Sequence, residues 1–147
     1  MHIFTSIPMA RRTLQVRYLA LYSHVLLLIF IGIWQFYIIE NQPYSFTFIL
    51  FIYLFPLCLP LWGVIRGKPY THAWASFVVL FYFIHSVTVL YVEPEQGVYA
   101  LAELTLSITM FTGTCLFARL RGRECGLGLN KLKDVMAEEK SHFERKY

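Results

Sequence analysis

Charge is missing from long stretches of this sequence. No Asp, Glu, Lys or Arg occurs in residues 18–39, 41–65 or 69–92, and residues 97–118 contain a single charge, Glu103. Each stretch exceeds the ~20 apolar residues that a helix needs to cross a bilayer. Continuous apolar runs of this length exclude the alternating strands of a membrane barrel. The sequence therefore predicts four membrane-spanning helices.

Lysine and arginine are missing from two of the three connections between these stretches. Residues 40–44 and 93–97 carry only acidic charges, whereas all thirteen basic residues lie before the first stretch, between the second and third, or after the fourth. Because cytoplasmic loops carry the excess of basic residues, we expect both termini in the cytoplasm. The basic residues expected to fix the topology and to meet lipid headgroups are Arg66, Lys68, Arg119, Arg121 and Arg123.

The predicted fold class is an all-α membrane protein, an antiparallel four-helix transmembrane bundle with both termini inside. We divide the chain into a cytoplasmic lead (1–16), a membrane domain (17–119) and a cytoplasmic tail (120–147). The expected spans are residues 17–39, 45–65, 71–92 and 98–118. In the tail, residues 130–145 place apolar side chains near one helical face, which fits either a short amphipathic helix or a solvated tail.

Several chemical signatures are also missing. The three cysteines form no C-x-x-C pair, and there is no zinc-ligand spacing, phosphate-binding glycine loop or Ser/His/Asp set. A haem held by two histidines is disfavoured, because His24 and His85 would differ in depth by about 10 Å in a ~30 Å core. The net charge of +4 is spread over a membrane face and two tails, so nucleic acid is not an expected partner. Nothing points to a catalytic residue, a metal or a cofactor.

Two ionisable side chains lie inside predicted spans and form a candidate intramembrane polar pair. Glu103 stands about one turn into the fourth span, and His85 about seven residues from the end of the third. At 1.5 Å per residue both lie about 8–10 Å below the outer surface, which permits contact. A buried carboxylate must be protonated, paired or facing water. Three alternatives follow: a clamp between two helices, a proton or cation site reached from outside, or no contact.

The fourth span is rich in small and polar residues on two faces. Helical spacing places Glu103 with Ser107, Met110 and Thr114 on one face, and Thr105 with Thr109, Thr112 and Gly113 on the other. Small and polar residues mark contacts between helices in membranes, so we expect this span to be central in the bundle. The alternative is a conduction path lined by hydroxyl groups.

Prolines and glycines mark the second span. Pro56 and Pro60 each remove a backbone donor and should kink the helix, so that carbonyls near them need partners inside the bundle. The spacing of Gly63 and Gly67 matches a helix-dimer pattern, but weakly, since Arg66 already marks the end of the span.

Three parts of the sequence are distinctive: the run from Leu59 to Ser76, the histidine that ends the segment 82–85, and the glutamate within residues 101–104. In these parts the chain resembles a family of small bacterial membrane proteins with a domain of unknown function. The resemblance covers about residues 18–120. It implies four helices in the bacterial inner membrane, and it assigns no activity to any residue.

These observations leave three hypotheses for function. The first is a non-enzymatic accessory or structural protein that contacts the bilayer and either a second copy of itself or another membrane protein. The second is a small transporter or channel component with a proton or cation site at His85 and Glu103. The third, a membrane enzyme or redox carrier, has the fewest residues in its favour.

Overall fold

The computed structural model describes residues 8–40, 43–126, 136, 140 and 141, and all regular structure in this part of the chain is helical. The prediction of an all-α membrane fold is therefore confirmed. The elements are α2 (Arg11–Ile33), η1 (Trp34–Ile38), α3 (Phe46–Ile49), η2 (Leu50–Leu54), α4 (Phe55–Ile65), α5 (Pro69–Val92), η3 (Pro94–Gln96) and α6 (Gly97–Glu124). The predicted tail helix, residues 130–145, falls outside the described residues except for Met136, Lys140 and Ser141.

Four helical rods in the described residues are long and apolar enough to cross a membrane. They are Arg11–Ile38, Phe46–Ile65, Pro69–Val92 and Pro94–Glu124. The rods run past several predicted span ends, notably on the side that carries the basic residues. How much of each rod lies in the hydrocarbon core stays a prediction.

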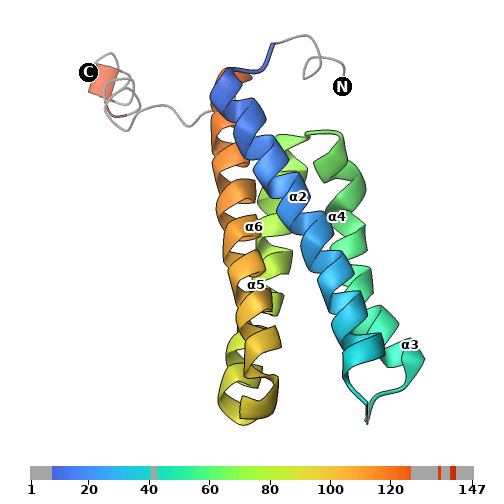
Figure 1. Ribbon diagram of the computed structural model, residues 1–147. Coiled ribbons are helices and arrows are strands. Elements are labelled where there is room, and N and C mark those ends of the chain that lie inside the picture. Colours follow the sequence, from blue (N-terminus) through green and yellow to red (C-terminus); the bar gives the residue numbers. More distant parts are fainter. Residues whose placement is uncertain (1–7, 41–42, 127–135, 137–139, 142–147) are drawn as a thin grey trace.

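The rods are arranged as two helical hairpins, and Figure 1 shows that successive rods run in opposite directions. α6 lies beside α5 and is crossed by α2, and these two pairs make the most extensive contacts in the bundle. The hairpin of α2 and α4 diverges from the hairpin of α5 and α6 toward the end that carries the two acidic connections (Figure 1).

The core is lined by side chains from every rod, while large apolar side chains also cover the outside. Fully buried residues include Leu27, Trp34, Leu57, Val79, Tyr82 and Met110. Rings and aliphatic side chains that face outward include Tyr22, Phe46, Phe77, Ile84 and Leu101. A surface this apolar suits lipid rather than water.

Small residues allow α6 to approach α2 closely. A side chain at Gly113 would begin 3.0 Å from the backbone of Ala20, so any larger residue would require the two helices to move apart. The prediction that α6 packs against other helices on two faces is only partly right. Thr105 and Thr112 are exposed, and each donates its hydroxyl to a carbonyl one turn back, which satisfies the hydroxyl without a neighbouring helix.

The second rod changes its hydrogen-bond pattern just before Pro56, whereas Pro60 lies within the continuous helix α4. The π-helical turn η2 ends directly before the Phe55–Pro56 step, where the N–H of Phe55 reaches the carbonyl of Leu50. Widened turns of this kind are often found at helix irregularities. Side chains from other helices bond to carbonyls three residues before each proline: the Tyr82 hydroxyl donates to Tyr53 O (2.7 Å) and His24 Nε2 to Leu57 O (2.8 Å).

Gly63 and Gly67 serve the hairpin between α4 and α5. Gly67 has a φ of +67°, and the bonds from Gly67 N to Val64 O (3.0 Å) and from Lys68 N to Gly63 O (3.1 Å) close the end of α4. A side chain at Gly63 would overlap with Thr71 of α5. Both glycines are thus explained by contacts within the chain rather than by a helix dimer.

Candidate functional site

The structure brings His85 and Glu103 together. α5 presents His85 and α6 presents Glu103, and His85 Nδ1 lies 2.9 Å from Oε2 and 3.1 Å from Oε1 of the carboxyl group. Glu103 is completely buried, whereas the His85 side chain keeps 18% of its surface exposed. The alternative in which the two groups do not touch is therefore wrong.

The pair can share one proton in either of two forms. When Glu103 is ionised, the His85 Nδ1–H donates to the carboxylate; when Glu103 is protonated, its O–H donates to Nδ1. Either form satisfies the buried carboxyl group, which would otherwise be costly to keep in an apolar interior.

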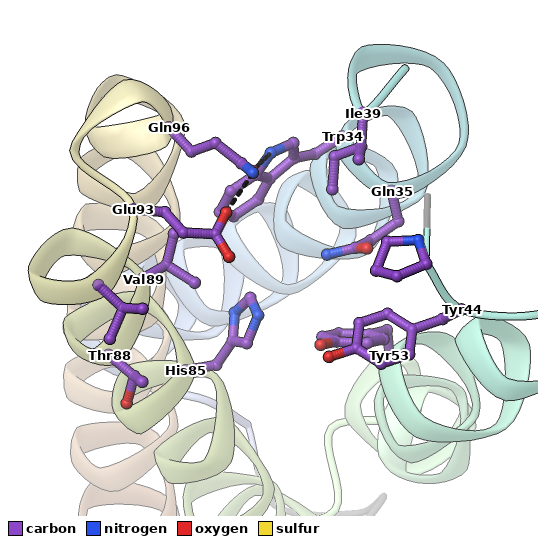
Figure 2. Close-up of a pocket in the computed structure, with 12 residues that line it drawn as sticks. Trp34, Gln35, Ile39, Tyr44, Tyr53, His85, Thr88, Val89, Glu93 and Gln96 are labelled. Atoms are coloured by element: carbon purple, nitrogen blue, oxygen red, sulfur yellow. Dashed lines mark hydrogen bonds between the residues drawn. The ribbon is translucent and has the colours of Figure 1, made fainter. Parts of the chain in front are cut away.

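His85 also borders a cavity of about 410 Å³. The cavity lies where the two hairpins diverge, and Figure 2 shows the imidazole ring pointing into it from α5. Its other polar or aromatic neighbours are Trp34, Gln35, Tyr44, Tyr53, Thr88, Glu93 and Gln96. A single water needs roughly 10–15 Å³ of such space, so the cavity has room for many waters.

Two aromatic side chains fix the position of the His85 ring. Trp34 from η1 and Tyr53 from η2 both meet it edge-on, with ring centroids 5.8 Å and 5.0 Å away. The imidazole is thereby held between segments far apart in the sequence, with one nitrogen on Glu103.

A second set of hydrogen bonds forms the rim of the cavity. Trp34 Nε1–H donates to Gln96 Oε1 at 3.1 Å, and the Gln96 amide donates in turn to the carboxylate of Glu93 (Figure 2). This chain of bonds connects the end of the first rod to the turn between α5 and α6.

The charged residue at the rim of the cavity is acidic. Glu93 is its charged lining residue at the rim, Glu103 lies behind His85, and no Lys or Arg is among the described residues that line it. Because basic side chains gather at the other end of the bundle, this charge is not offset locally.

The hydroxyl groups of α6 do not extend the cavity. The Thr114 hydroxyl donates to Met110 O at 2.8 Å, and that of Thr109 to Thr105 O at 2.8 Å. Ser107 is buried, and its Oγ lacks a hydrogen-bond partner in the described part of the chain. It borders a separate crevice of about 190 Å³, otherwise lined by apolar residues of α5 and α6.

The basic end of the bundle is more ordered than the sequence predicts. Arg66 lies over the ring of Trp62 (4.6 Å to the centroid). The expectation that Arg121 meets lipid headgroups is wrong, because this side chain is only 1% exposed and pairs with Glu124 at 2.9 Å. Glu124 also accepts hydrogen bonds from Thr13 Oγ1 and from the N–H of Ala10, which ties the start of α2 to the end of α6.

Glu124 lies beyond the predicted fourth span, and its pKa is lowered from its ordinary value of 4.5. Partial loss of hydration raises the pKa, but the hydrogen bonds from Thr13, Arg121 and Ala10 and the charge of Arg121 together outweigh it.

Two other histidines are fully buried and serve the packing. His24 bonds to Leu57 O, and His72 Nδ1 bonds to Lys68 O at 2.9 Å while its ring packs on Phe117 with centroids 4.1 Å apart. The second ring nitrogen of each has no hydrogen-bond partner in the described residues. Within those same residues, no group of three or more His, Cys, Asp or Glu is placed to hold a metal ion.

A family model described as "Predicted membrane protein (DUF2069)" matches residues 19–122. The chain belongs to this family. The DUF2069 match includes both members of the polar pair and every residue that lines the cavity. No curated protein matches the chain, and no solved structure does.

Sequence reasoning finds His85 and Glu103 but misses the residues that surround them. Trp34, Tyr53 and Gln96 come from three segments. Alone, Trp34 is an ordinary interfacial residue, Gln96 an ordinary loop residue and Tyr53 one of many aromatic residues inside the second span. The nearest signal in the sequence is the aromatic content of the first two spans, which is equally typical of lipid-facing positions.

Proposed function

We propose that this DUF2069 protein is a non-enzymatic protein of the bacterial inner membrane that binds a proton or a small cation at His85 and Glu103, reached from outside the cytoplasm. The asymmetry of the basic residues supports this orientation, since the acidic connections then face outward with the cavity.

One observation carries the proposal: His85 touches a fully buried carboxyl group on one side and an open cavity on the other. A pair that only clamps two helices is best sealed from water on all sides, because sealing strengthens its attraction. Here the imidazole connects Glu103 to space large enough for water.

The chemistry of this arrangement is a single proton relay. Nδ1 of His85 is occupied by Glu103, which leaves Nε2 as the ring nitrogen that exchanges a proton with the cavity. A proton taken up at Nε2 can be matched by release at Nδ1 to the carboxylate, so that Glu103 gains a proton without contacting bulk water.

The test is infrared difference spectroscopy on the full chain in lipid vesicles while the external pH is changed. We expect the carboxyl stretching band of a buried acid to respond to the external pH, to vanish in Glu103→Gln and to lose its response in His85→Phe. The matched control is Glu95→Gln, because Glu95 is an exposed acid in the connection between α5 and α6 and does not border the cavity. A Glu103 band that ignores external pH in the folded wild-type protein contradicts the proposal.

A second candidate is an accessory protein that binds another membrane protein or a second copy of this chain. The observation in its favour is that the His85–Glu103 pair joins α5 and α6, which make the most extensive contacts in the bundle, so the pair also suits a structural clamp. In this case His85→Ala and Glu103→Gln lower the folded yield together and non-additively. A fixed partner then co-purifies in mild detergent and is identified by cross-linking and mass spectrometry.

A further inference from the structure

We infer that the cavity above His85 binds a small organic ammonium ion, a protonated amine with a short apolar chain. This inference rests on the proposed function in taking the cavity as open to the outside, and it assigns a ligand to the space beyond the proton site.

The walls of the cavity offer the surfaces that ammonium ions prefer. Three aromatic residues, Trp34, Tyr44 and Tyr53, border it together with His85. Figure 2 shows the rings of Tyr44 and Tyr53 together at one wall of the cavity, where Tyr53 meets the His85 ring edge-on with centroids 5.0 Å apart. Aromatic faces attract cations through their quadrupole, and clusters of such rings recognise alkylated ammonium groups.

The charge distribution selects a cation over an anion. Glu93 stands at the rim, and the carboxyl group of Glu103 lies behind His85, with no basic residue among the described lining residues. An acidic mouth raises the local concentration of cations, whereas an anion would meet an uncompensated carboxylate.

The apolar part of the lining argues against a bare metal ion as the ligand. Ile39, Val89 and Val92 supply aliphatic surface between the polar groups. A hard metal ion needs several converging oxygens, and the described residues provide no cluster of three or more acidic, histidine or cysteine ligands. The volume of about 410 Å³ falls within the range of pockets for small organic molecules.

The experiment uses tryptophan fluorescence of the full chain in lipid nanodiscs. The chain has three tryptophans, and Trp62→Phe with Trp74→Phe leaves Trp34 as the only reporter, at the cavity wall. Both replaced rings are substantially exposed, so the bundle should tolerate the changes. The probes are butylammonium, its neutral analogue butanol and the anion butyrate, at constant ionic strength.

We expect saturable quenching or a spectral shift with butylammonium and none with butanol or butyrate. Glu93→Gln should weaken the binding of butylammonium by roughly five- to tenfold through loss of the rim charge. Tyr53→Leu should weaken it by a similar factor, while Tyr53→Phe keeps the ring and the affinity. Glu95→Gln is the matched control and should leave the affinity unchanged.

Equal responses to the three probes, or no saturable response to butylammonium, would overturn the inference. The two proposals fail separately. If the Glu103 band follows external pH but butylammonium does not bind, the proton site stands and the ligand is wrong. If Glu93→Gln weakens the binding of butylammonium while the infrared band of Glu103 does not respond to external pH, the ammonium site is supported and the proton relay is wrong.

Discussion

At the scale of single residues, three polar groups of the interior bond to partners on other helices. Glu103 meets His85, the Tyr82 hydroxyl meets Tyr53 O, and His24 meets Leu57 O. Lipid offers no hydrogen bonds, so these polar groups act as contacts between helices and not merely within them. Two of the three bonds end on the carbonyls that precede the prolines of the second rod.

The bond from Tyr82 gives the first prediction. Tyr82→Phe removes the hydroxyl that donates to Tyr53 O and should lower the free energy of unfolding by about 0.5–1.5 kcal/mol. Thermal unfolding in mild detergent measures the effect. Tyr91→Phe makes the same chemical change at a ring that is 88% exposed and should leave stability unchanged. If Tyr82→Phe and Tyr91→Phe change the free energy of unfolding by the same amount, the hydrogen bond from Tyr82 to Tyr53 O contributes no stability of its own.

Glu124 gives a prediction about pH. Its pKa is lowered in the folded protein, so its contacts with Thr13 and Arg121 add stability above pH 4.5, and this contribution is lost as pH falls through the lower folded pKa. Glu124→Gln should remove that part of the pH dependence. The check is a series of unfolding curves at pH values from neutral downward. If the free energies of unfolding of the wild type and the variant differ by the same amount at every pH, Glu124 is not the source of this pH dependence.

At the scale of elements, α6 organises the bundle because it packs against both α5 and α2. Its contact with α2 depends on Gly113, whose missing side chain lets the two backbones approach. Its contact with α5 includes the His85–Glu103 pair. The second rod packs on both α5 and α2, and its end is closed by the turn at Gly67.

The close approach of α2 and α6 gives a prediction with an internal control. Gly113→Ala would place a methyl group 3.0 Å from the Ala20 backbone and should destabilise the fold by about 1–3 kcal/mol through overpacking. Gly122→Ala, in the same helix, meets nothing within 4 Å and should be neutral or stabilising by up to about 1 kcal/mol. Unfolding in detergent distinguishes them. If the alanine at position 113 is as well tolerated as the one at position 122, the described packing of α2 on α6 is wrong.

At the scale of the whole molecule, the two ends of the bundle differ in character. One end carries the basic side chains and is closed by the contacts of Glu124 with the start of α2. The other end carries the acidic connections and the cavity between the diverging hairpins. The proposed orientation puts the closed end in the cytoplasm and the open end outside.

Orientation is tested by thiol labelling of intact spheroplasts. In a chain with Cys58, Cys115 and Cys125 replaced by alanine, Glu95→Cys should react with a membrane-impermeant maleimide, and Arg119→Cys should react only after the membrane is permeabilised. Both positions are exposed, so reactivity depends on the side of the membrane rather than on burial. The reverse pattern would invert the topology and place the cavity on the cytoplasmic side.

The sequence predicts much of this arrangement because the bilayer imposes simple rules. Four uncharged runs define the helices, and the depth of His85 and Glu103 follows from the rise per residue, so their proximity can be anticipated. The burial of Arg121 and the exposure of Thr105 cannot be predicted from the sequence, because basic residues and threonines occur both in the interior and at the surface. The π-helical turns at η1 and η2 have no signal beyond Pro56.

What the sequence by itself determined is the existence of four apolar helices and of two ionisable residues within them at similar depth, since both depend on the cost of placing charge in hydrocarbon. Only the tertiary structure decided that His85 faces a cavity. That cavity depends on how far two hairpins diverge and on rings contributed by Trp34 and Tyr53, and such packing is set by the shapes of many side chains at once.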